Sequence, residues 1–372
     1  MNKKFNTFLT ALFCGFLGGM LVISTILPDV DFSQLENRSL ARLPKFSISS
    51  VKEGKFMADA EAYASDHLVG RDLWVSLKSW CERLTGKQEN NGVYFGKEQT
   101  LINRLENPDM SKLEENMGHV EQLVDNLSVP VYFGLIPSAA SIWADRLPDG
   151  APTADEKAII DHLYTLTQAQ TLDLYGGLEA HAHEALYYRT DHHWTSLGAY
   201  YGYQTLTQAM GMTPVALESL TPTTVTEEFY GTIFSSSGVR WVAPDSIQTY
   251  IPDQGLQVTS YFDGSPTQGS LYAEEFLEKK DKYSYFLGGV QPLCTIKTEK
   301  QDAPKVLLIR DSYSDSLAPF LTENFSEIHL WDLRWNVNSL QEYVAEQEID
   351  HVVVLYSISN FLSDKNLFLL GR

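Results

Sequence analysis

The chain has 372 residues, of which 44% are hydrophobic, and a formal net charge of −20 at pH 7. This length and composition suit one large globular domain or two smaller ones. The charge argues against nucleic acid as a partner, because an acidic surface repels phosphate groups. A soluble, acid-rich exterior explains the charge best.

An apolar segment at residues 5–27 contains no charge, and about 20 such residues can cross a bilayer. Lys3 and Lys4 precede it, and Asp29 follows it. The positive-inside rule therefore predicts a single-pass cell-membrane protein with a cytoplasmic N-terminus and an extracytoplasmic body. A cleaved signal peptide is the alternative, although its apolar region is usually shorter and no A-x-A-like site ends this one.

The three cysteines are Cys14, Cys81 and Cys294, and none belongs to a CxxC pair or to a zinc-binding spacing. Cys14 lies in the apolar segment, so an internal disulfide could join only Cys81 and Cys294. Two free thiols are the favoured interpretation. A lipoprotein site at Cys14 is rejected, because bulky Phe13 precedes it and too little apolar sequence lies before it.

The predicted organisation is a membrane anchor at residues 1–28, a juxtamembrane part at 29–90 and an α/β domain at 91–372. In the juxtamembrane part, the spacing of apolar residues predicts a helix over residues 52–84 that is interrupted at Gly70.

The α/β domain alternates predicted strands with predicted helices, which indicates a parallel sheet with helices on both faces. The expected fold is therefore a three-layer, flavodoxin-like sandwich. Residues 218–281 are rich in Thr, Ser, Gly and Pro, and we interpret them as an inserted segment of strands and loops. Helices are predicted at residues 109–126, 155–170, 196–210, 313–321 and 339–346, and strands at 129–136, 172–175, 305–309, 327–333 and 351–356.

A serine follows the predicted strand at residues 305–309. The run Val306–Ile309 is wholly apolar, as in a central parallel strand, and ligands bind beyond the carboxyl ends of such strands. Ser312 lies just beyond this end. If a helix begins at Tyr313, the N–H groups of its first turn could stabilise an oxyanion near Ser312. A role for Ser312 as a helix N-cap is the alternative.

A second polar segment, Asp191-His192-His193-Trp194, precedes the predicted helix at residues 196–210. Asp191 and His193 are two residues apart, so their side chains can project to one side. The carboxylate could then hold one ring nitrogen and leave the other as a base. Trp194 is expected to pack and fix the loop. A capping Asp191 beside solvated histidines is the alternative. With Ser312, these groups could form a serine-nucleophile triad.

Two other interpretations of the histidines were weighed. His181 and His183, together with Asp191, His192 and His193, form a dense group of potential metal ligands, but no HExxH motif is present. The Asp-His-His triplet also resembles that of the DHH phosphoesterases, whose other acidic motifs and glycine-rich element are not visible here. We therefore predict no metal and no cofactor.

The segment Asp191-His192-His193-Trp194 resembles the signature that names the DHHW protein family. That family is similar to SGNH-hydrolase-like proteins, including the alginate O-acetylation proteins of bacterial envelopes. In those proteins an Asp-x-His-Trp-Thr element is followed much later by a strand and a Ser-Tyr-Ser turn, which here begins at Ser312. Residues 36–38, 66–72 and 281–289 also look familial.

The resemblance implies an SGNH-like fold in which Asp191 and His193 precede the nucleophile Ser312, a permuted order. It selects His193 over His192 as the base and leaves His192 and Trp194 in supporting roles. It also implies O-acetyl transfer to a cell-surface or secreted polysaccharide, with the acyl group supplied by a membrane O-acyltransferase partner. A carbohydrate esterase (deacetylase) and a non-catalytic glycan-binding envelope protein are the alternatives.

The oxyanion-hole glycine and asparagine of ordinary SGNH enzymes have no clear counterpart in this sequence. Arg334, at the end of a predicted strand, is the first candidate to stabilise the anion or contact substrate, and a surface ion pair is its alternative role. Tyr313 and Asn360 are weaker candidates.

Overall fold

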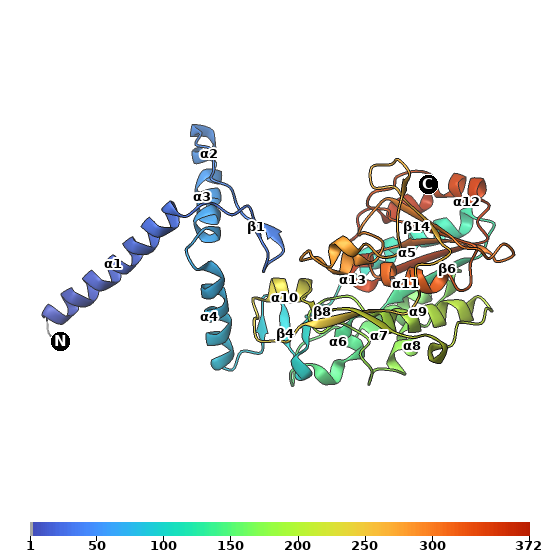
Figure 1. Ribbon diagram of the computed structural model, residues 1–372, viewed down its shortest axis with the longest axis horizontal. Helices are drawn as coiled ribbons and strands as arrows, with labels where there is room; N and C mark the ends of the chain where they lie inside the picture. Colours follow the sequence, from blue (N-terminus) through green and yellow to red (C-terminus); the bar gives the residue numbers. More distant parts are fainter. Residues whose placement is uncertain (1–2) are drawn as a thin grey trace. The chain divides into compact units, whose positions relative to one another are not determined.

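The computed structural model describes residues 3–372, and the chain forms two compact units. Unit 1 contains the chain up to Asn91 together with Phe234–Trp241. Unit 2 contains Gly92–Ile233 and Val242–Arg372. Figure 1 shows the elements of both units, and each unit is described by itself.

Unit 1 begins with the apolar helix α1, Lys3–Ile26, which has the length and composition to cross a membrane and buries none of its side chains. The predicted helix at residues 52–84 is divided at Gly70, whose φ of 69° is left-handed and suits glycine. The other elements of unit 1 are β1 (Phe32–Ser33), β2 (Arg38–Ser39), α2 (Ile48–Lys52), α3 (Lys55–Asp66), α4 (Arg71–Leu84) and β3 (Glu89–Asn90).

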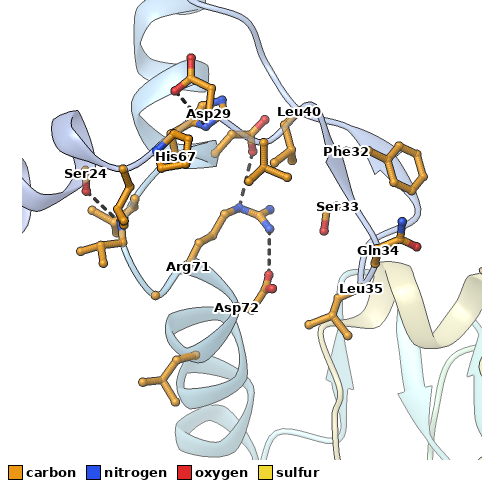
Figure 2. Close-up of a pocket in the computed structure, with 18 residues that line it drawn as sticks. Ser24, Asp29, Phe32, Ser33, Gln34, Leu35, Leu40, His67, Arg71 and Asp72 are labelled. Atoms are coloured by element: carbon orange, nitrogen blue, oxygen red, sulfur yellow. Dashed lines mark hydrogen bonds and ion pairs between the residues drawn. The ribbon is translucent and has the colours of Figure 1, made fainter.

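An ion-pair network ties the β1–β2 hairpin to the corner between α3 and α4. Arg38 donates from Nε to Glu36 at 2.7 Å and from Nη1 to Asp66 at 2.9 Å. Arg71 donates to the same Glu36 carboxylate at 2.6 Å. The hydrogen bonds from Arg38 lower the pKa of Asp66 to about 2. Asp66 and Arg71 also line a cavity of about 440 Å³, shown in Figure 2.

Unit 2 is built on an eight-stranded sheet in the order β11-β10-β12-β14-β13-β15-β6-β7. The strands from β14 to β7 run parallel, whereas β12, β10 and β11 each run antiparallel to the neighbour nearer the centre. The strands are β6 (Val131–Ile136), β7 (Gln170–Thr171), β10 (Gln257–Ser260), β11 (Thr267–Gln268), β12 (Leu293–Lys297), β13 (Lys305–Arg310), β14 (Glu327–Trp331) and β15 (His351–Ser357).

The prediction of a parallel sheet is therefore wrong at one edge. No long helix crosses over between β10, β11 and β12, so the chain returns antiparallel. Part of the segment predicted as an insertion, residues 218–281, thus extends the main sheet. The five parallel strands lie in the order β14-β13-β15-β6-β7. If β13, β14, β15, β6 and β7 are numbered 1 to 5, this is the doubly wound order 2-1-3-4-5. In this order, β13 and β15 flank the switch point, where ligands bind in such sheets.

Helices cover both faces of the sheet, which gives three layers (Figure 1). In β13, Val306 and Leu308 face one core while Leu307 and Ile309 face the other, as the period of two requires. The first core packs under α8 (Leu174–Glu179), α9 (Ser196–Ala209) and α11 (Ser314–Leu321). The second packs under α5 (Met110–Asn126), α7 (Glu156–Tyr164), α12 (Leu340–Gln347) and α13 (Ile358–Ser363).

Two predicted elements differ from the structure. The strand predicted at residues 172–175 is wrong, because α8 begins at Leu174 and Asp173 caps it by accepting from the Gly176 N–H. The helix predicted at residues 155–170 ends at Tyr164. The remaining elements are β4 (Val93–Phe95), β5 (Leu101–Asn103), α6 (Ala139–Ile142), β8 (Thr223–Phe229), α10 (Thr232–Ser237), β9 (Asp245–Thr249) and the 3-10 helices η1 (Lys97–Gln99), η2 (Ala144–Arg146), η3 (Leu217–Ser219), η4 (Glu274–Phe276), η5 (Tyr283–Tyr285) and η6 (Leu367–Gly371).

Candidate functional site

The candidate site lies in unit 2, where β13 ends beside β15. β13 ends at Arg310 and α11 begins at Ser314, so Ser312 lies in the turn between them and is partly exposed. The Asp311 carboxylate fixes this turn. Its Oδ1 accepts from the Tyr313 N–H at 3.0 Å, and its Oδ2 accepts at 2.8 Å from both the Ser357 N–H and Asn360 Nδ2. Asp311 therefore joins the serine turn to the end of β15.

The loop before α9 brings His193 to this serine. His193 Nε2 lies 2.8 Å from Ser312 Oγ, and its Nδ1 lies 2.6 Å from Asp191 Oδ1. The Asp191 side chain also accepts from the His193 backbone N–H at 3.0 Å, which holds the two residues in a tight turn. Thr195 caps α9 by accepting from the Gly198 N–H, as predicted. The Ser312 hydroxyl, the His193 imidazole and the Asp191 carboxylate thus form one hydrogen-bonded row, which is called the row below.

Thr232 supports the far oxygen of Asp191. Its N–H donates to Asp191 Oδ2 at 2.7 Å, and its hydroxyl donates to the same oxygen at 2.9 Å. Burial by itself raises the pKa of Asp191, but the imidazoles of His192 and His193 and the hydrogen bonds outweigh it. The pKa is held well below its ordinary range, so the buried carboxylate is ionised.

Tyr283 packs against the His193 ring with the two rings parallel, 3.7 Å between centroids and 8° between planes. The Tyr283 hydroxyl donates to the Ser312 carbonyl at 3.0 Å. One side chain therefore contacts both the imidazole and the serine turn. Our sequence reasoning did not select Tyr283, Thr232 or Asp311, although Tyr283 lies within residues 281–289, which look familial.

His192 and Trp194 lie beside the row rather than in it. His192 Nδ1 is 2.8 Å from Thr232 Oγ1, and burial together with the neighbouring His193 lowers the pKa of His192 to about 4. Trp194 is fully buried and donates from Nε1 to the Tyr313 carbonyl at 2.8 Å. This bond ties the histidine loop to the serine turn.

The three candidates for oxyanion or substrate contacts have different surroundings. Arg334 is held by Asp332, with 2.9 Å from Nε to Oδ1 and 2.6 Å from Nη2 to Oδ2. The Tyr313 hydroxyl donates to the His192 carbonyl, and Asp311 accepts from the Tyr313 N–H. Arg334 and Asn360 both line a cavity of about 290 Å³.

A second cavity, of about 270 Å³, adjoins Asn360 on the side of His192 and Tyr313. Ser138 and Ala139, just after β6, line it as well. The two cavities therefore share Asn360 as a lining residue, beyond the carboxyl ends of the parallel strands. The Ser312 N–H has no hydrogen-bond acceptor within residues 3–372, which leaves it available to a ligand oxygen.

The five residues weighed as metal ligands do not all belong to one cluster, because His181 and His183 are not part of it. The side chain of His181 pairs with Glu184 at 2.8 Å and stacks on Tyr201, and His183 is 79% exposed. Potential ligand atoms of Asp191, His192 and His193 do lie within 4.8 Å of one another. However, both ring nitrogens of His193 already face hydrogen-bond partners.

The family model described as DHHW protein matches residues 120–331. A DHHW family protein from Eubacterium siraeum has a similar structure, with a TM-score of 0.67 and 22% identity, covering 76% of this chain and 96% of that chain. No curated protein matches this sequence.

Two further solved structures are similar. Bacillus cereus PatB1, solved with a sulfonyl adduct, has a TM-score of 0.61 and 20% identity, covering 73% of this chain and 96% of that chain. The O-acetyltransferase domain of Pseudomonas putida AlgJ has a TM-score of 0.46 and 16% identity, covering 73% of this chain and 93% of that chain.

Proposed function

This chain belongs to the DHHW protein family, and we propose that it is a serine O-acyltransferase acting on a cell-surface or secreted polysaccharide. The observation that carries the proposal is the 2.8 Å contact between His193 Nε2 and Ser312 Oγ, with Asp191 on the other ring nitrogen. A hydroxyl that can pass its proton to an oriented imidazole is an activated nucleophile.

In the proposed first step, His193 Nε2 takes the Ser312 proton as Oγ attacks the carbonyl carbon of the acyl donor. Asp191 accepts from Nδ1–H, holds the tautomer and stabilises the imidazolium. The tetrahedral intermediate then collapses, the donor's alcohol leaves with the proton from His193, and an acyl-serine remains. In the second step, His193 takes a proton from a sugar hydroxyl, whose oxygen attacks the acyl-serine carbonyl. The bond from this carbonyl to Ser312 Oγ then breaks, and His193 returns the proton to Oγ, which leaves an acylated sugar and free Ser312.

The intermediate carries a negative oxygen that needs donors. We assign this role to the Ser312 N–H, because it has no acceptor within residues 3–372, and to the second N–H of the Asn360 amide, whose first N–H donates to Asp311. The donors of Tyr313 are engaged by His192 and Asp311, so we assign it a packing role. Arg334 is paired with Asp332 and lines a cavity, and we propose it as a substrate contact.

The proposed setting follows from the N-terminal helix and from the family resemblance. Residues 1–28 anchor the chain, residues 29–90 form the juxtamembrane part, and residues 91–372 form the catalytic body outside the membrane. A membrane O-acyltransferase would supply the acyl group. Protease treatment of intact cells tests the topology, because it should digest the chain beyond about Pro28. A protected body, or a mature N-terminus after Leu27, would contradict it.

The activity is tested with the full chain in detergent, a chromogenic acetyl ester and a glycan acceptor. An acceptor-dependent acetyl-glycan product is the expected result. Ester hydrolysis that ignores the acceptor would favour the esterase alternative. Silence in both assays would favour a glycan-binding protein.

The nucleophile is tested with phenylmethylsulfonyl fluoride, since the similar protein Bacillus cereus PatB1 was solved with a sulfonyl adduct. The intact mass should increase by one adduct in the native chain and stay unchanged in Ser312→Ala. The matched pair His193→Ala and His192→Ala then identifies the base. His193→Ala should abolish labelling and turnover, whereas His192→Ala should retain most of both. The opposite pattern would show that the base is misassigned.

A further inference from the structure

Helix α4 of unit 1 exposes an apolar stripe. Five large apolar side chains, spaced by one, three or four residues, are between 38% and 82% exposed: Leu73, Trp74, Leu77, Trp80 and Leu84. Cys81 is exposed between them. At 100° per residue, all six positions fall within about 120° of the helix circumference. They therefore form one continuous stripe, which we call the α4 stripe.

The opposite side of α4 is polar except for the half-buried Val75, and it packs against protein. Ser79 is fully buried there, and its hydroxyl accepts from Asn90 Nδ2 at 3.0 Å. A helix on a water-soluble domain normally buries its apolar side and exposes its polar side. α4 does the reverse, so its stripe needs an apolar environment that the described part of unit 1 does not supply.

One side chain of the α4 stripe contacts the apolar helix α1. The Trp74 ring packs edge-on against Phe16, with 6.4 Å between centroids. The Val69 N–H, just before α4, donates to Ser24 Oγ at 2.9 Å. Phe16 is ten residues before Ile26, about 15 Å along the helix, which is half the thickness of a hydrocarbon core. The start of α4 thus contacts the half of α1 that ends at Ile26.

The composition of α4 fits a bilayer surface. Trp74 and Trp80 are of the type that collects at the boundary between headgroups and acyl chains. Residues 71–87 carry four basic and two acidic side chains, in a chain with a net charge of −20. A helix with an apolar stripe, tryptophans and flanking cations lies in the membrane interface. Trp80 packs on Trp241, with 4.7 Å between ring centroids, and is still 44% exposed.

We propose that α4 is a membrane-associated helix, whose stripe enters the leaflet next to Ile26 when α1 spans the bilayer, most deeply at Trp74. The protein would then contact the membrane twice, by a spanning helix and by the apolar side of α4. This inference rests on the insertion of α1 and does not depend on the chemistry of Ser312.

The native Cys81 thiol provides the test. The full chain with Cys14→Ser is labelled at Cys81 with an environment-sensitive fluorophore and reconstituted in vesicles of phosphatidylcholine and phosphatidylglycerol. Cys294 is buried and should not react. Nitroxide-labelled phosphatidylcholine should quench the Cys81 label at least about threefold. The matched control adds Cys81→Ser and Asp72→Cys, which moves the label to an exposed position off the stripe, and quenching there should be slight.

Three results would overturn the proposal. Equal, weak quenching at both α4 positions would place the stripe in water. A blue-shifted Cys81 label that lipid does not quench would mean that protein covers the stripe, and a Cys81–Cys81 crosslink would identify a second copy. A label at Cys14, in a chain with Cys81→Ser in place of Cys14→Ser, reports on α1, and a lack of quenching by lipid there would overturn the α4 proposal together with the anchor. Labelling of Ser312 by phenylmethylsulfonyl fluoride would be unaffected in every case.

Discussion

Replacing Gly231 with alanine should disable the site although Ser312, His193 and Asp191 all remain in the sequence. A Cβ at this position would lie 2.2 Å from Asp191 Cβ and 2.3 Å from Asp191 Oδ2. Ordinary contact begins at 3.4 Å, so the two Cβ atoms would have to separate by 3.4 − 2.2, or about 1.2 Å. Asp191 Cβ is attached directly to the backbone and cannot rotate away, so the carboxylate or the loop must shift.

A shift of this size breaks the 2.6 Å contact between Asp191 and His193. Misplacement by about 1 Å can cost about 10²-fold in rate, and loss of the orienting carboxylate about 10⁴-fold. We therefore expect Gly231→Ala to lower ester turnover by about 10² to 10⁴-fold. Overpacking should also cost about 1–3 kcal/mol of unfolding free energy. Both are measured on the same sample, by turnover and by denaturant unfolding.

Two variants separate misplacement from misfolding. Gly118→Ala adds a methyl group in α5 with nothing within 4 Å, so it should keep full turnover and gain up to about 1 kcal/mol of stability. Asp191→Asn keeps the side-chain volume and should lose turnover while staying folded. A folded Gly231→Ala within about threefold of native turnover would refute the reasoning, as would an active Asp191→Asn.

The remaining predictions concern the surroundings of the row. Tyr283→Phe keeps the ring but removes the donor to the Ser312 carbonyl, so turnover should fall about tenfold and stability by about 1 kcal/mol, measured by ester assay and denaturant unfolding. Trp194→Phe leaves the buried Tyr313 carbonyl without its indole donor and should cost about 1–3 kcal/mol in the same unfolding assay. The pKa of His192 falls from about 6.5 in the unfolded chain to about 4 in the folded chain, so between these values the unfolded chain binds more protons. The contribution of His192 to the unfolding free energy should therefore fall as the pH drops from about 6.5 to 4, so the unfolding free energy of the native chain minus that of His192→Asn should fall over this range. If the unfolding free energy of His192→Asn changed with pH as steeply as that of the native chain, the prediction would be wrong.

Local features of the site follow from sequence alone. The spacing of Asp191 and His193 allows a tight turn that brings carboxylate and imidazole together, and the structure has this turn, with the His193 N–H donating to Asp191. Thr195 caps α9, and an apolar strand leads to the turn with Ser312. The apolar helix α1 is equally local. Hydrogen bonds and burial periodicity between near neighbours determine these features, so composition and spacing reveal them.

Contacts between distant segments were decided only by the tertiary structure. Ser312 and His193 are 119 positions apart, and Thr232 and Tyr283 reach the row from other elements. The antiparallel edge of the sheet depends on strand pairing, which periodicity does not encode.

The same division holds for α4. Its apolar spacing predicts a helix, but it does not reveal that the buried side is the polar one at Ser79. Sequence determines which side chains share a face, because the helical period is a property of the backbone. Tertiary structure determines which face is covered, because that depends on which distant surfaces are available to pack against it.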